Sequence, residues 1–183
     1  MNAQTALKHT VSFTALLGAG LAALGCGAPE DVLERSAQDD SPPTAAQSLT
    51  YPFVEYRSGV SAFFCLDVRM GTPVSETPVH IWACNSTYAQ QWAYNPNTQE
   101  LRSALNVNLC LDVQGGSSAP NTPVQIYYCN GTAAQRWIRN DNEFRTVLNP
   151  SYCLDVRGGV ASQGTIVEIY ACNNSASQQW LLQ

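Results

Sequence analysis

Hydrophobic and polar residues alternate with a period of two over short stretches after residue 50, and no stretch there has the spacing of an amphipathic helix. Three stretches share one pattern, in which Val and Ile are predicted to point inward and the residue between them outward. They are Val79-His80-Ile81-Trp82, Val124-Gln125-Ile126-Tyr127 and Val167-Glu168-Ile169-Tyr170. Clusters of Gly, Pro, Asn and Ser separate the stretches. The pattern predicts an all-β domain of short strands.

The same part of the chain contains three copies of one unit, at about 51–95, 96–140 and 141–183. Each copy has Glu-x-Arg-Ser/Thr, then Cys-Leu-Asp-Val, then a second cysteine followed by Asn, and finally Gln-x-Trp. The first cysteines are Cys65, Cys110 and Cys153, the second are Cys84, Cys129 and Cys172, and the motifs end at Trp92, Trp137 and Trp180. A unit of this size cannot close its own core, so three must pack together. A propeller needs more blades than three, and the units therefore predict a β-trefoil.

Cys-Leu-Asp-Val, the aromatic residue two places before the second cysteine, and Gln-x-Trp together resemble the ricin-type β-trefoil lectin domain. All three copies match, and the resemblance covers residues 51–183. It implies a non-catalytic domain that binds glycans or polysaccharides, with galactose- or xylose-type sugars expected.

In that family, the Asp of the motif accepts hydrogen bonds from sugar hydroxyls and the aromatic residue stacks on the sugar ring. The resemblance therefore implies carbohydrate-binding roles for Asp67, Trp82, Asp112, Gln125, Tyr127, Asp155 and Tyr170. The alternative is that each Asp only braces the fold through the Gln of Gln-x-Trp. The Trp residues of Gln-x-Trp are predicted to be core, because a large ring suits the centre of the three-fold domain.

Two departures from the family pattern distinguish the three units. Ala89, Ala134 and Ser177 stand where the family often has an Asn that shares a sugar hydroxyl with the Asp. Only the second unit keeps a Gln two residues before the ring, as Gln125, whereas the first has His80 and the third has Glu168, an acid that brings no donor. The second unit is therefore predicted to bind sugar best. Asn85, Asn130 and Asn173 could replace the missing amides, but turn formation is the favoured interpretation.

The chain has seven cysteines, and Cys26 is set apart from the six in the repeats. Six cysteines allow many pairings, and the three-fold symmetry favours Cys65–Cys84, Cys110–Cys129 and Cys153–Cys172. Such bridges form in an oxidising compartment. A metal site is disfavoured because no Cys-x-x-Cys spacing occurs and only one His follows Cys26.

The N-terminal segment predicts export. Val11–Leu24 is a mostly apolar run, too short to span a bilayer comfortably, and it leads into Gly25-Cys26. Small residues before a cysteine resemble a lipobox, which implies a signal peptide over 1–25 and a lipidated Cys26 on the bacterial envelope. Outer-membrane placement is favoured, since Gly27 stands where an Asp would retain the protein in the inner membrane. Residues 26–50 then form the lipidated cysteine and a disordered tether. The alternative is ordinary cleavage and secretion.

After removal of residues 1–25, the chain has eight arginines, no lysine and fourteen acidic residues, which gives a net charge of −6. This charge argues against nucleic acid as a partner, and membrane contact is expected through the lipid anchor alone. A monomer without cofactor or metal is expected. Catalysis is disfavoured because symmetry should place the three motif Asp residues far apart and His80 has no nucleophile beside it. The alternative function is a protein-binding or structural trefoil, such as an inhibitor or envelope interaction protein with degenerate sugar sites.

Overall fold

The computed structural model describes residues 51–183, so the predictions for the signal peptide, the lipidated Cys26 and the tether lie outside the described residues. Each unit contributes four strands. The first has β1 (Val54–Ser58), β2 (Phe64–Val68), β3 (Thr77–Ala83) and β4 (Gln91–Asn95). The second has β5 (Glu100–Ser103), β6 (Leu109–Val113), β7 (Thr122–Tyr128) and β8 (Trp137–Asn140). The third has β9 (Glu143–Thr146), β10 (Tyr152–Val156), β11 (Val167–Ala171) and β12 (Trp180–Leu182).

Short 3₁₀ helices follow the second strand of each unit and precede the fourth. They are η1 (Arg69–Gly71), η2 (Tyr88–Gln90), η3 (Gln114–Gly116), η4 (Ala133–Gln135), η5 (Arg157–Gly159) and η6 (Ala176–Gln178). In residues 51–183, no helix has the length and apolar character needed to cross a membrane.

The first and fourth strands of the units form a barrel. Antiparallel ladders join β1 to β4, β4 to β5, β8 to β9 and β12 to β1. Backbone hydrogen bonds from Trp137 N to Gln99 O and from Trp180 N to Asn142 O, both 2.8 Å, link the remaining neighbours. The Trp of each Gln-x-Trp motif lies opposite the hydroxyl residue that ends Glu-x-Arg-Ser/Thr: Trp92 opposite Ser103, Trp137 opposite Thr146 and Trp180 opposite Ser58. The two repeated motifs therefore join successive units around the barrel.

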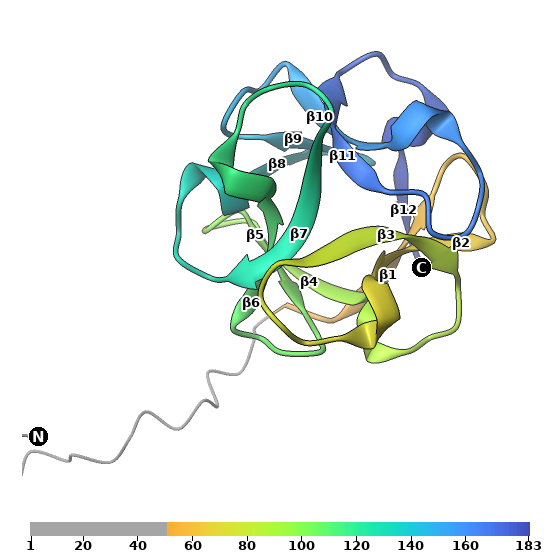
Figure 1. Cartoon of the computed structure of the whole chain (residues 1–183), viewed down its shortest axis with the longest axis horizontal. Helices are drawn as coiled ribbons and strands as arrows, with labels where there is room; N and C mark the ends of the chain where they lie inside the picture. The colour runs from red at the N-terminus through yellow and green to blue at the C-terminus, as the bar shows by residue number, and fades with distance from the viewer. Residues whose placement is uncertain (1–50) are drawn as a thin grey trace, which may run out of the picture. The chain divides into compact units, whose positions relative to one another are not determined.

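The second and third strands form three hairpins that cap the barrel. Each hairpin pairs in full register, and β3 also pairs with β7, and β7 with β11. An isolated bridge between His80 and Ile166 completes the ring. In Figure 1, β3, β7 and β11 form a triangle around the centre of the view. This arrangement confirms the predicted all-β trefoil.

The Gln-x-Trp tryptophans fill the core, as predicted from the sequence. All three are fully buried, and each indole Nε1 donates a 3.0 Å hydrogen bond to the carbonyl oxygen of the Leu in Cys-Leu-Asp-Val. The acceptors are Leu66, Leu111 and Leu154. A buried ring with its polar N–H satisfied stabilises the core without the cost of an unpaired donor.

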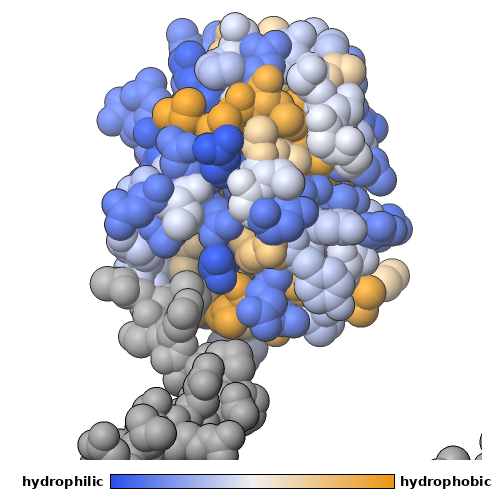
Figure 2. Space-filling model, turned by 90° about the vertical axis from the view of Figure 1, so that its left-hand side faces the viewer, coloured by the Kyte–Doolittle hydropathy of each residue, from blue (hydrophilic) through white to orange (hydrophobic). Residues whose placement is uncertain are grey.

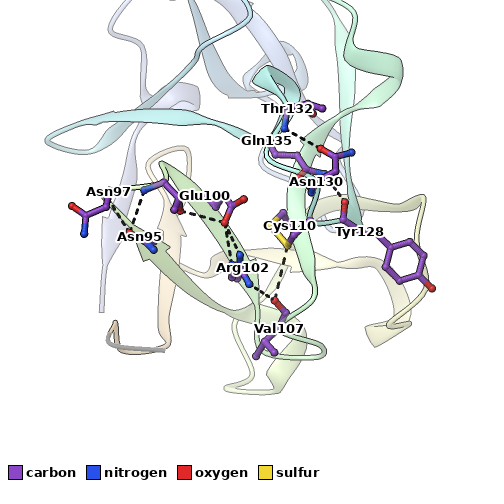
Figure 3. Close-up of polar contacts among 12 residues, drawn as sticks. Asn95, Asn97, Glu100, Arg102, Val107, Cys110, Tyr128, Asn130, Thr132 and Gln135 are labelled. Atoms are coloured by element: carbon purple, nitrogen blue, oxygen red, sulfur yellow. Dashed lines mark hydrogen bonds and ion pairs between the residues drawn. A yellow bond between two sulfur atoms is a disulfide. The ribbon is translucent and has the colours of Figure 1, made fainter. Parts of the chain in front are cut away.

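Three disulfides join Cys65 to Cys84, Cys110 to Cys129 and Cys153 to Cys172, so the pairing within units is confirmed. Each bridge ties the start of a hairpin to its end, with the two Cα atoms 5.1 Å apart. An ion pair between partly exposed Arg102 and buried Glu100, with Nη2 to Oε2 at 2.7 Å, lies beside the second bridge (Figure 3). Arg102 also donates to Val107 O at 3.2 Å and so holds β5 against the loop before β6.

The residue between Val and Ile lies on the outer face of its hairpin but is buried there. His80, Gln125 and Glu168 line the pockets and are only 6%, 6% and 2% exposed. Each lies directly opposite the motif Asp of its hairpin, in the register pairs Asp67–His80, Asp112–Gln125 and Asp155–Glu168. The outer face of each hairpin is therefore the floor of a hollow rather than an open surface.

Candidate functional site

Each unit has a surface pocket with the motif Asp at its floor. The Asp is the fourth residue of β2, β6 or β10 and is at most 5% exposed. We call the hollows around Asp67, Asp112 and Asp155 the first, second and third pockets. Their volumes are about 710 Å³ for the first two and about 520 Å³ for the third. The three carboxylates thus lie in three separate pockets.

In the first pocket, two side chains hold the Asp67 carboxylate. Nε2 of His80 lies 2.9 Å from Oδ1, and Nε2 of Gln90 donates to Oδ2 at 2.9 Å. The His80 ring stacks on the indole of Trp82, with centroids 5.4 Å apart and planes at 15°. Trp82 is 39% exposed, so it presents an apolar surface at the pocket wall.

The second pocket repeats this geometry with an amide in place of the imidazole. Gln125 donates from Nε2 to Oδ1 of Asp112 at 3.1 Å, and Gln135 donates to Oδ2 at 3.2 Å. Oε1 of Gln125 is buried and has no hydrogen-bond partner within residues 51–183. Burial raises the pKa of the Asp112 carboxyl, and the two amide hydrogen bonds only partly oppose the shift. Half-buried Tyr127 lines the same pocket.

The third pocket is built differently. Ser177 donates from Oγ to Oδ2 of Asp155 at 2.8 Å, and burial again raises the pKa of this carboxyl. Glu168 is paired with Arg157, whose Nη2 also donates to Asn121 O at 3.1 Å. Glu168 itself brings no donor to this pocket, and the guanidinium of the neighbouring Arg157 supplies one. Tyr170, 40% exposed, completes the wall.

The Gln of each Gln-x-Trp motif is a brace. In the second unit, Gln135 accepts from the backbone N of Asn130 at 2.7 Å and donates to Tyr128 O at 2.9 Å (Figure 3). Asn130 in turn accepts from Thr132 N at 3.0 Å through its own side chain. The equivalent contacts of Asn85 and Asn173 are also present. These Asn residues form turns, which is the interpretation that the sequence favoured. The Gln residues of the first two units also hold the motif Asp in place at the pocket floor.

Two protein-family profiles match the chain. The ricin-type beta-trefoil lectin domain matches residues 98–183, and the ricin-type beta-trefoil lectin domain-like profile matches residues 59–127. The chain belongs to the ricin-type β-trefoil lectin family. Together the two matches include the pocket residues of all three units of this lectin domain.

Solved structures share the trefoil of this lectin domain. A mosquitocidal holotoxin is 20% identical with a TM-score of 0.64 over 73% of the chain, and the chain spans 17% of its length. The designed three-fold symmetric protein ThreeFoil is 23% identical with a TM-score of 0.63, covering 71% of this chain and 96% of its own. The C-half of an earthworm R-type lectin, solved with GalNAc, is 15% identical with a TM-score of 0.62. The match covers 72% of this chain and 98% of the earthworm chain. No curated protein matches the chain.

Among the pocket residues that the sequence missed, one in each pocket occupies an equivalent position of the repeat. Glu76 lines the second pocket, Asn121 the third and Gly164 the first, and each comes from a different unit than the Asp. All three have positive φ, and their backbone N–H groups donate to Ile126 O, Ile169 O and Ile81 O. The signal was present as a repeated turn, but only the pairing of hairpins brings that turn to the next pocket.

The described residues contain no group of three or more His, Cys, Asp or Glu side chains placed to hold a metal ion. The Glu and Arg of the Glu-x-Arg-Ser/Thr motifs lie in the barrel and not in the pockets. Arg145 pairs with buried Glu143 at 3.0 Å, as Arg102 does with Glu100. These charges stabilise the fold, and the three motif Asp residues remain the candidate ligand-binding acids at the pocket floors.

Proposed function

We propose that this domain binds carbohydrate through its three pockets and catalyses no reaction. The observation that carries the proposal is a buried carboxylate at each pocket floor, oriented by side-chain donors, with a partly exposed aromatic ring beside it. A carboxylate accepts hydrogen bonds from adjacent sugar hydroxyls, and an aromatic ring covers the C–H face of the sugar. The pocket residues are Asp67, Trp82, Asp112, Gln125, Tyr127, Asp155 and Tyr170.

Galactose- or xylose-type sugars are the proposed ligands. The earthworm lectin domain, which shares the fold, was solved with GalNAc. On the face shown in Figure 2, hydrophobic residues form patches separated by polar ones. A single large apolar patch would instead favour a protein partner.

The second pocket is proposed to bind a single sugar most tightly. Gln125 orients the Asp112 carboxylate and carries the polar atom of this floor, Oε1, that lacks a protein partner. A ligand hydroxyl that reaches this atom would satisfy a buried acceptor, which is worth more than a contact to a solvated group. In the third pocket, the Arg157–Glu168 pair takes up part of a smaller hollow.

The protein is proposed to be displayed on the bacterial envelope through a lipidated Cys26, with residues 27–50 as the tether and 51–183 as the lectin domain. The disulfides support a location outside the cytoplasm. Cys26→Ser should move the protein from the membrane fraction to the soluble fraction. Unchanged membrane partition of this variant would contradict the anchor.

A glycan array tests the proposed function. The probe is the exported chain carrying Cys26→Ser, clustered on a multivalent support because weak sites gain from linkage. The comparison is a variant with Asn at positions 67, 112 and 155, and the control is Asp141→Asn, which changes an exposed acid outside the pockets. Binding that survives in the control and disappears in the triple variant supports a lectin. No binding by the clustered parent protein would favour the protein-binding or structural alternative.

A further inference from the structure

The first pocket differs from the other two at two positions of its rim. Met70 in η1 corresponds to Gly115 and Gly158, and Tyr88 in η2 corresponds to Ala133 and Ala176. Both Met70 and Tyr88 line the first pocket. The three-fold repeat thus has large apolar side chains at one pocket where the other two units have almost none.

Neither side chain contributes to the core. Met70 is 87% exposed and Tyr88 is 68% exposed, which leaves most of their apolar surface in water. Met70 also has φ 57° and ψ 13°, a left-handed conformation that the equivalent glycines adopt with φ 64° and 63°. This conformation is unfavourable for a residue with a side chain and costs nothing at glycine. An exposed methionine in a strained position, with no packing to offset the strain, points to contact with something outside the fold.

The first pocket has a glycine beside the ring of Trp82. Gly164 stands where the other pockets receive Glu76 and Asn121, and a Cβ there would lie 4.0 Å from Cζ3 of Trp82. The glycine therefore leaves the edge of the Trp82 ring uncovered. Ile166 adds a further apolar side chain from the third unit. Leu105 adds one from the second unit, so the first pocket has a polar floor at Asp67 and apolar side chains from all three units.

We infer that the first pocket selects sugars that carry an apolar substituent, with the sugar ring at Asp67 and Trp82 and the substituent between Met70 and Tyr88. The inference rests on the proposed carbohydrate binding and adds a ligand class for one pocket. A thioether and a phenol ring together suit an aromatic or acyl group, because sulfur contacts ring edges favourably and the substituent would remove both exposed apolar surfaces from water. The second and third pockets, with glycine and alanine at these positions, take the unsubstituted sugar.

Matched glycosides test the inference in variants that keep one pocket. The exported chain with Cys26→Ser receives Asp112→Asn and Asp155→Asn, which leaves the first pocket, or Asp67→Asn and Asp155→Asn, which leaves the second. Methyl and phenyl glycosides of galactose, N-acetylgalactosamine and xylose are titrated by calorimetry. For the sugar that binds, the phenyl glycoside should bind the first pocket about tenfold more tightly than the methyl glycoside, as expected for burial of one ring face. At the second pocket the two should bind alike.

A residue exchange then assigns the preference to the rim. Met70→Gly with Tyr88→Ala installs the residues of the second unit at exposed positions, one of them a glycine where φ is positive. The phenyl-to-methyl ratio at the first pocket should fall to that of the second. Equal binding of both glycosides by the unaltered first pocket overturns the inference and leaves the proposed function standing. Absence of glycoside binding at every pocket overturns both.

Discussion

Gln125 donates a hydrogen bond from Nε2 to Oδ1 of Asp112, and its own Oε1 is buried without a partner in residues 51–183. One side chain therefore orients the pocket acid and carries an unused acceptor beside it. An amide at position 112 could donate to that acceptor, whereas the carboxylate cannot.

Asp112→Asn should accordingly separate binding from stability. Monosaccharide binding should fall at least about tenfold, since hydrogen bonds to a charged acceptor are lost. The free energy of unfolding should change by less than about 1 kcal/mol, because burial already disfavours the charged form and the new amide can pair with Gln125. Calorimetric titration and urea unfolding measure the two effects.

The equivalent variants provide the comparison for that experiment. Asp67→Asn and Asp155→Asn should reduce binding less than Asp112→Asn if the second pocket binds best. Wild-type affinity in the Asp112 variant would contradict the ranking. Loss of the native fold in that variant would instead show that the acid is a structural brace.

Acidification should affect binding and stability in opposite directions at two pockets. Burial raises the pKa of Asp112 and Asp155 above the usual value of about 3.9. Sugar binding that needs the carboxylate should fall as the pH falls through the raised pKa values. For folding, a raised native pKa gives stability that is fully present below the unfolded-state pKa and is lost as the pH rises through the native pKa. These two groups therefore favour the fold at acid pH, where they favour binding least.

NMR titration of the Asp carboxyl carbons, with affinity measured from about pH 7 to about pH 4, checks this prediction. The Asp112→Asn and Asp155→Asn variants are the controls, because the second and third pockets should then lose their pH dependence. Affinity at these pockets that stays constant over the range would be inconsistent with carboxylate acceptors.

Removing one disulfide should destabilise the domain without moving the pocket acids. Cys110→Ala with Cys129→Ala opens a loop of sequence separation 19, and loops of that length are worth about 3 kcal/mol. Denaturant unfolding of the double variant against the parent measures the loss. Alkylation of the folded parent under non-reducing conditions should label no cysteine in residues 51–183. A labelled cysteine there, or an unchanged unfolding free energy, would contradict the role given to the bridges.

Alkaline pH should destabilise the barrel through Tyr56. This ring is 1% exposed and packs edge-on against Phe144 at 5.2 Å, and burial raises its pKa to about 12. Because the native pKa is above the unfolded value of about 10, the stability from neutral Tyr56 is present below pH 10 and lost as the pH rises toward 12. The loss should reach about 2 kcal/mol.

Tyr56→Phe should remove this part of the alkaline loss, as measured by unfolding free energy at several pH values. Tyr128→Phe is the matched control, since Tyr128 is 60% exposed. If both variants lose stability with pH as the parent does, Tyr56 is not the group responsible.

The sequence alone determined the repeat, the all-β trefoil, the three bridges and the core tryptophans. Each of these depends on spacing within one unit, and identical spacing in three copies leaves few alternatives. Trp92 and Cys65 recur at the same offset in every unit, so one local solution serves all three. The motif Asp was found for the same reason, because Cys-Leu-Asp-Val contains it.

Only the tertiary structure decided what surrounds that Asp. Alternation placed His80 on the side opposite to Val79 and Ile81, but the hollow on that side buries it against Asp67. Gly164 reaches the first pocket through pairing between hairpins of different units, a long-range contact that the repeated turn does not reveal by itself. Spacing within a unit specifies its strands and bridges, whereas the pocket walls form where units meet. The sequence therefore named the Asp and the aromatic residue that line each candidate pocket, and the fold supplied the residues around them.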